Sequence, residues 1–145
     1  MIKQKNMVDF FQEHLGYTNE EISEFMKNPR NQKILAKAPG LLKKTIIFEV
    51  IESHGCNSQH KVGDKIYFDG QGNLLTKLCP KRICVFAMGV MEKAIFGALE
   101  MFYAGLDPNE MLFKRGGCSD IGLKCGGWGK VILEFRIEDR NLSSK

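Results

Sequence analysis

The sequence predicts an α+β fold: a small, mostly antiparallel sheet packed on one long buried helix, with a helical N-terminal appendage. Two observations lead to this prediction. Three segments alternate polar and apolar residues as half-buried strands do: residues 44–52, 65–69 and 130–138. A long, mostly apolar stretch at residues 80–103 has the composition of a helix that is buried on most sides.

The helical appendage is expected to cover residues 1–43. Apolar residues recur at helical spacing in residues 6–15, and Thr18-Asn-Glu-Glu21 matches a capping box that opens a second helix. A third helix, residues 30–38, is expected to stop before Pro39 because proline disrupts helix interiors. Three roles remain open for this appendage: a cap on the core domain, a contact in a homodimer, or a lid over a site.

The core domain is expected to cover residues 44–139. Its first strand places Ile46, Phe48 and Val50 on one face. In the long helix, Pro80 suits the first turn and Gly105 lies just past the end. A transmembrane span has the same length, but three charged residues argue against a membrane: Glu92, Lys93 and Glu100.

The end of the chain contains two short patterns before a frayed tail. Residues 111–113 suggest a short strand, and residues 115–129 contain six glycines, which allow tight turns and close approach. The last strand turns four apolar residues inward: Val131, Leu133, Phe135 and Ile137. Residues 140–145 are expected to fray.

Composition excludes several classes of function. The net charge of +4 lies outside residues 46–138, which carry eleven basic and eleven acidic residues, so no basic stripe indicates nucleic-acid binding. The N-terminus lacks the apolar run of a secretory signal. Five cysteines without an export signal indicate a reducing, cytoplasmic compartment, where clustered cysteines serve more often as ligands or reactive thiols than as disulfides.

The loop between the first two strands is the strongest candidate for chemistry. Cys56 and His60 are spaced so that one loop brings sulfur and nitrogen onto a single metal ion. Zinc prefers such ligands, and Cys79 and Cys118 would complete a set of three cysteines and one histidine, with Cys125 as a substitute. Iron and an iron–sulfur cluster are the alternative cofactors.

Other side chains near this loop have supporting or competing interpretations. His54, Asp64 and Asp120 are candidates for moving protons beside a metal, although Asp64 also fits a turn and His54 a surface or supporting position. Without a metal, Cys56 or Cys118 would be a nucleophile with a histidine as its base. Cys84, placed inside the apolar helix, is expected to be a small buried residue.

The order of these residues resembles a family of small uncharacterised Cys/His proteins that is frequent in anaerobic bacteria and archaea. The resemblance rests on Cys56…His60-Lys-Val-Gly63-Asp64, Cys79, the long helix, Cys118-x-Asp120 and Phe135-Arg136-Ile137, within residues 45–138. Gln59 departs from the pattern, which usually has glycine there, and residues 122–129 are longer and richer in glycine. The resemblance implies one shared site: Cys56, His60, Asp64, Cys79, Cys118 and Asp120.

Two functions follow as expectations. The first is a small metal-dependent hydrolase or lyase that acts on a small molecule in anaerobic metabolism, with Asp64 or Asp120 moving protons. The second is a non-enzymatic module in which a structural metal supports binding of a partner protein. A pocket lined by Trp128, His54 and the glycine-rich segment would favour the enzyme.

Overall fold

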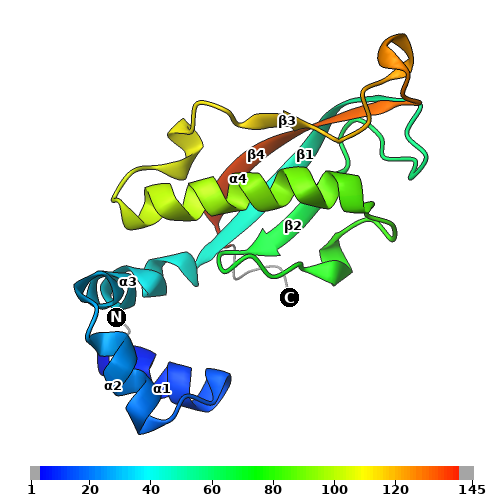
Figure 1. Cartoon of the computed structure of the whole chain (residues 1–145). Coiled ribbons are helices and arrows are strands. Elements are labelled where there is room, and N and C mark those ends of the chain that lie inside the picture. Colours follow the sequence, from blue (N-terminus) through cyan, green and yellow to red (C-terminus); the bar gives the residue numbers. More distant parts are fainter. Residues whose placement is uncertain (1–3, 141–145) are drawn as a thin grey trace. The chain divides into compact units, whose positions relative to one another are not determined.

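The computed structural model describes residues 4–140, and the side chains of residues 7–140 (Figure 1). The chain forms two compact units that divide between Lys43 and Lys44. Four helices and a four-stranded antiparallel sheet confirm the predicted α+β class. Most of the predicted tail, residues 141–145, lies outside the described residues.

The first unit consists of α1 (Gln4–Leu15), α2 (Asn19–Met26) and α3 (Pro29–Leu41). The predicted capping box is present: the Glu21 N–H donates to Thr18 Oγ1 at 3.2 Å, and the Thr18 N–H donates to Glu21 Oε2 at 2.8 Å. These two bonds satisfy N–H groups that the start of a helix otherwise leaves unpaired, so they explain why α2 begins where it does.

Helix α3 does not stop before Pro39, as the sequence suggested, but continues to Leu41. Pro39 has no N–H to donate to the preceding turn, so the helix loses one hydrogen bond there. The Leu42 N–H donates to Ala38 O at 3.3 Å and closes the following turn. Leu41 is buried, and the burial of this side chain offsets the missing bond.

The second unit, the core domain, is a sheet of β1 (Lys44–His54), β2 (Lys65–Asp69), β3 (Arg115–Gly117) and β4 (Lys130–Asp139). The strand order is β2-β1-β4-β3, and all pairs are antiparallel. Helix α4 (Val85–Tyr103) lies across one face of this sheet (Figure 1). Among the described residues, no helix combines the length and the apolar character that a membrane crossing requires.

The core lies between the sheet and α4, and its centre is Phe48. This side chain is 1% exposed, and its ring meets those of Phe68 and Phe135 edge-on, with centroids 5.9 and 5.6 Å apart. Such aromatic pairs contribute about 0.5–1.5 kcal/mol each beyond the area they bury. Every residue that the sequence turned inward on β1 and β4 is buried: Ile46, Phe48, Val50, Val131, Leu133, Phe135 and Ile137.

Two element boundaries in the core domain differ from the prediction. Helix α4 begins at Val85 and not at Pro80, because Cys84 has an extended backbone and caps the helix: its Sγ accepts the Ala87 N–H at 3.4 Å. Residues 111–113 are not a strand. Beside this segment, the Asn109 side chain pairs with the N–H and the C=O of Ile137, both at 2.9 Å, and takes the place of a strand backbone.

Gly116 of β3 faces α4 without room for a side chain, because a Cβ there would lie 2.5 Å from Val90 Cγ1. We predict that Gly116→Ala lowers the free energy of unfolding by about 1–3 kcal/mol through overpacking. The penalty should shrink in a Val90→Ala background, since the clashing methyl group is then absent. Urea unfolding of the single and double variants measures both effects.

Gly89→Ala is the matched control, because Gly89 lies within α4 and nothing lies within 4 Å of its would-be Cβ. This variant should gain about 0.5–1 kcal/mol, since alanine favours the helix over glycine. If Gly116→Ala were as stable as the wild type, close approach to Val90 would not be what positions α4 on the sheet.

Candidate functional site

Two loops and a helix terminus meet at one end of the core domain, which we call the loop end. Residues 55–64 leave β1 there, residues 118–129 lead into β4, and the N-terminus of α4 lies at the same end (Figure 1). The β1–β4 ladder brings the loops together, since His54 pairs with Lys130.

Glycine allows the two loops to pack backbone against backbone. A Cβ on Gly55, whose φ is +63°, would lie 2.8 Å from the Trp128 carbonyl oxygen, and a Cβ on Gly129 would overlap the Gly55 carbonyl. No other residue type fits either position without moving a backbone. The glycine-rich composition of the second loop is therefore partly explained by this contact.

Asp120 holds the second loop in shape. Its Oδ1 accepts the N–H groups of Gly122 at 3.0 Å and Trp128 at 2.9 Å, and its Oδ2 accepts the Gly129 N–H at 3.0 Å. These donors, Gly122 first, then Gly129 and Trp128, lower the pKa of Asp120 below its ordinary value of 3.8. A carboxylate bound in this way is better suited to organising the loop than to moving protons.

A cavity of about 290 Å³ opens at the loop end. Four of the predicted site residues line it: Cys56, His60, Cys118 and Asp120. The expected Trp128 and Gly129 of the glycine-rich segment line it as well. The sequence therefore identified both loops that form the cavity.

His60 is the most unusual residue of this cavity. It is 4% exposed, and its Nε2 is a buried side-chain nitrogen for which the described residues provide no hydrogen-bond partner. An unsatisfied buried polar group costs about 1–3 kcal/mol, so native structures rarely contain one without a reason. The backbone of His60 is fixed separately, because its carbonyl accepts the Ser53 hydroxyl at 2.5 Å.

Gln59, just before His60, is the only non-glycine among the described residues with positive φ, at +61°. Left-handed backbone is the conformation that glycine adopts without penalty, whereas other residues pay roughly 1–2 kcal/mol. In this chain the strain is retained beside the buried imidazole.

Cys84 lines the cavity too, and the sequence did not indicate this. It was expected inside the helix as a small buried residue, but it is only half-buried because it precedes α4 as the N-cap. Cysteine is not among the residue types that usually mark an N-cap, so the sequence carried no signal for the role. A third thiol therefore joins Cys56 and Cys118, whose Sγ accepts the Val131 N–H at 3.4 Å.

Four predicted site residues do not line the cavity. Cys79 lies beside β2, where its Sγ accepts the Tyr67 N–H at 3.3 Å. Asp64 accepts the Lys61 N–H at 2.9 Å within a turn, in the competing role considered for it. His54 and Cys125 are exposed.

The donors at the cavity suit a soft metal in kind but not in their present orientation. Thiols and an unpaired imidazole nitrogen are the groups that zinc prefers. Yet among residues 7–140, no three Cys, His, Asp or Glu side chains are placed to hold a metal ion together. A metal site here would therefore require these side chains to move closer together.

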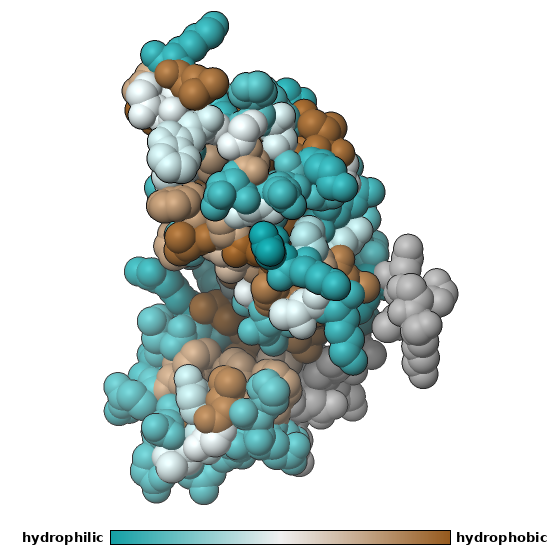
Figure 2. Space-filling view, turned by 90° about the vertical axis from the view of Figure 1, so that its right-hand side faces the viewer, coloured by the Kyte–Doolittle hydropathy of each residue, from teal (hydrophilic) through white to brown (hydrophobic). Residues whose placement is uncertain are grey.

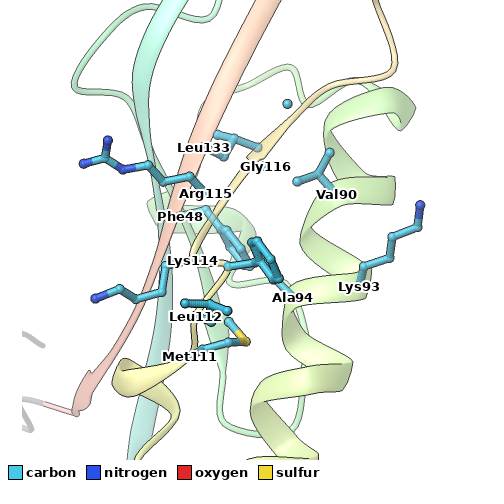
Figure 3. Close-up of a pocket in the computed structure, with 12 residues that line it drawn as sticks. Phe48, Val90, Lys93, Ala94, Met111, Leu112, Lys114, Arg115, Gly116 and Leu133 are labelled. Carbon is cyan, nitrogen blue, oxygen red and sulfur yellow. The ribbon is translucent and has the colours of Figure 1, made fainter.

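A larger groove of about 490 Å³ separates α4 from residues 111–117 (Figure 3). Its floor is apolar, with Phe48 and Leu133 at the base. Figure 3 shows the charged ends of Lys93, Lys114 and Arg115 pointing away from it. Because a binding site needs convergent polar groups as well as volume, the smaller cavity at the loop end is the better candidate.

Comparison with family models, with curated proteins and with solved structures gave no match for this chain. The resemblance to the Cys/His family stays a prediction from the residues that carry it.

We predict that Asp120→Asn loosens residues 120–129, because an amide NH2 group cannot replace both acceptor oxygens. Wild-type loop order should persist above about pH 3.8 and be lost as the pH falls through the lowered pKa of Asp120, since the charged form accepts the three N–H bonds. In the variant, this pH dependence should be absent. Amide hydrogen exchange of Gly122, Trp128 and Gly129 measures both effects.

Asp139→Asn is the control, because Lys44 lowers the pKa of Asp139 in the same direction at the other end of the β1–β4 ladder. It should leave the loop amides unchanged. Equal protection of those amides in wild type and Asp120→Asn would rule out the organising role of Asp120.

Proposed function

We propose that the loop-end cavity binds a zinc-type metal ion, with Cys56, His60 and Cys118 as ligands and Cys84 as the fourth. The observation that carries this proposal is the buried, unpartnered Nε2 of His60 in a cavity that three thiols also line. Coordination would give this nitrogen a partner and remove the cost of leaving it unsatisfied.

Cys84 replaces the predicted Cys79 because of where each thiol lies. Cys84 lines the cavity, whereas Cys79 lies against the backbone of Tyr67 in β2. The Sγ atoms of Cys84 and Cys118 each accept one backbone N–H, at 3.4 Å. Similar outer donors orient and stabilise thiolates that are bound to a metal, so these contacts suit the proposal.

The space beside these residues favours an enzyme over a structural metal site. Four protein ligands are the set of a structural zinc site, so in an enzyme water or substrate would have to displace one thiolate or bind as a fifth ligand. The cavity volume of about 290 Å³ is close to the lower end of the range for small-molecule pockets. When bound in such a place, zinc polarises a carbonyl group or activates a water molecule, which is the chemistry of a hydrolase or lyase.

Other residues around the cavity would then have separate roles in binding a substrate. Asp120 fixes the loop that carries Trp128, and the aromatic side chain of Trp128 borders the cavity where a substrate would enter. Asp64 and His54, the other candidates for proton movement, do not line the cavity. The alternative, a partner-binding module with a structural metal, needs the same ligands but no open position.

We predict about one zinc ion per chain in protein purified without oxygen, measured by elemental analysis. Cys56→Ser, His60→Gln, Cys84→Ser and Cys118→Ser should each lose most of it. Cys79→Ser and Cys125→Ser are the matched controls and should keep it, because neither side chain lines the cavity. Circular dichroism checks that each variant remains folded.

The same samples separate the alternatives. Loss of metal from Cys79→Ser but not from Cys84→Ser would restore the set predicted from sequence, and a wild type without metal would overturn the proposal. Removal of the metal with a chelator should leave the protein folded if the metal is catalytic, whereas removal of a structural metal should unfold it.

A further inference from the structure

The mouth of the loop-end cavity is aromatic and exposed. Trp128 is 79% exposed and Phe86 is 58% exposed, and both line the cavity. Figure 2, in which the right-hand side of Figure 1 faces the viewer, shows hydrophobic residues exposed among hydrophilic ones on this side of the core domain. Exposed apolar groups that gather at a cavity indicate a surface that a ligand covers.

The polar part of the cavity favours negative charge. The first turn of α4 borders it through Phe86 and Ala87, and the first N–H groups of a helix have no acceptor within the helix, although the Ala87 N–H already donates to Cys84 Sγ. Helix N-termini attract anions for this reason. Lys130, the first residue of β4, lines the same cavity and adds a positive charge.

A second observation, which also carries the metal proposal, points to a ligand at this place. His60, 4% exposed, is a lining residue of the cavity, and its buried Nε2 lacks a partner within residues 7–140. The one carboxylate among the lining residues, Asp120, has its oxygens occupied by three backbone N–H groups of its own loop. Asp120 keeps its negative charge, but its oxygens are bound to its own loop.

We propose that the cavity binds a small aromatic carboxylate, with its ring between Phe86 and Trp128 and its charged group toward the N-terminus of α4 and Lys130. Flat aromatic side chains favour a planar partner, because stacked or edge-on rings gain contact beyond the area they bury. The inference deepens the proposed function by naming the class of substrate, and it rests on the same cavity. Binding of the ring and of the carboxylate does not itself require the metal.

Benzoate is the probe, and Trp128 is the reporter because it is the only tryptophan of the chain. Titration of the protein as purified, with its metal content measured, should change the tryptophan fluorescence saturably. Cyclohexanecarboxylate, which keeps the charge but is not flat, and benzyl alcohol, which keeps the ring but not the charge, should each bind about tenfold more weakly.

Two variants test the proposed contacts of the ring and the carboxylate, and two control variants test whether benzoate binds at the loop-end cavity. Phe86→Leu and Lys130→Gln should each weaken benzoate binding by about threefold to tenfold. Phe113→Leu and Lys114→Gln make the same substitutions at the groove of Figure 3 and should leave binding unchanged. All four positions are exposed, so the variants should fold.

The outcomes distinguish this inference from the metal proposal. If the protein holds no metal as purified but binds benzoate saturably, the ligand class is supported and the absence of metal overturns the metal proposal. Zinc without benzoate binding would overturn the ligand class alone. Equal affinity for benzyl alcohol, or equal weakening by Phe113→Leu and Phe86→Leu, would also overturn it.

Discussion

The pairing of β1 with β4 is the interaction on which the rest of the structure depends. These central strands run side by side from Lys44 opposite Asp139 to His54 opposite Lys130. Their inward faces supply most of the buried core, and Phe48 contacts Phe135 across the pair. Because both strands end together, two loops that are far apart in the sequence must leave the sheet at the same point, and the cavity forms between them.

The ends of the first loop are as firmly held as the strands. The Val50 N–H donates to Asp64 O at 2.9 Å, and the Gly63 N–H donates to Val50 O at 2.8 Å, next to the register shift in the β1–β4 ladder. The carboxylates of Asp64 and Asp120 both accept hydrogen bonds from backbone N–H groups. The acidic side chains therefore hold the loops, and the cavity between them is lined by three cysteines and His60.

The sequence predicted those parts of the molecule that local patterns determine. Alternation on β1 and β4 gave the core, and the spacing of Cys56 and His60 identified two residues that do share a cavity. β3 escaped detection because Arg115–Gly117 is too short and too rich in glycine to alternate. Whether Cys79 or Cys84 lies at the cavity depends on where α4 begins. Cys84 is the N-cap of this helix, and cysteine is not a residue type that predicts an N-cap from sequence.

At the loop end, residues occupy positions that are unfavourable for the stability of the fold. A histidine with an unsatisfied nitrogen is buried, a tryptophan is exposed, and Gln59, next to this histidine, has a left-handed backbone. An apolar residue at position 60, a polar one at 128 and a glycine at 59 would each relieve a local cost. Three such costs fall within or beside one cavity, although exposed hydrophobic side chains such as Leu112 and Phe113 also occur elsewhere in the core domain. Strain and misplaced polarity that gather in this way are characteristic of a site that gains its compensation from a bound ligand.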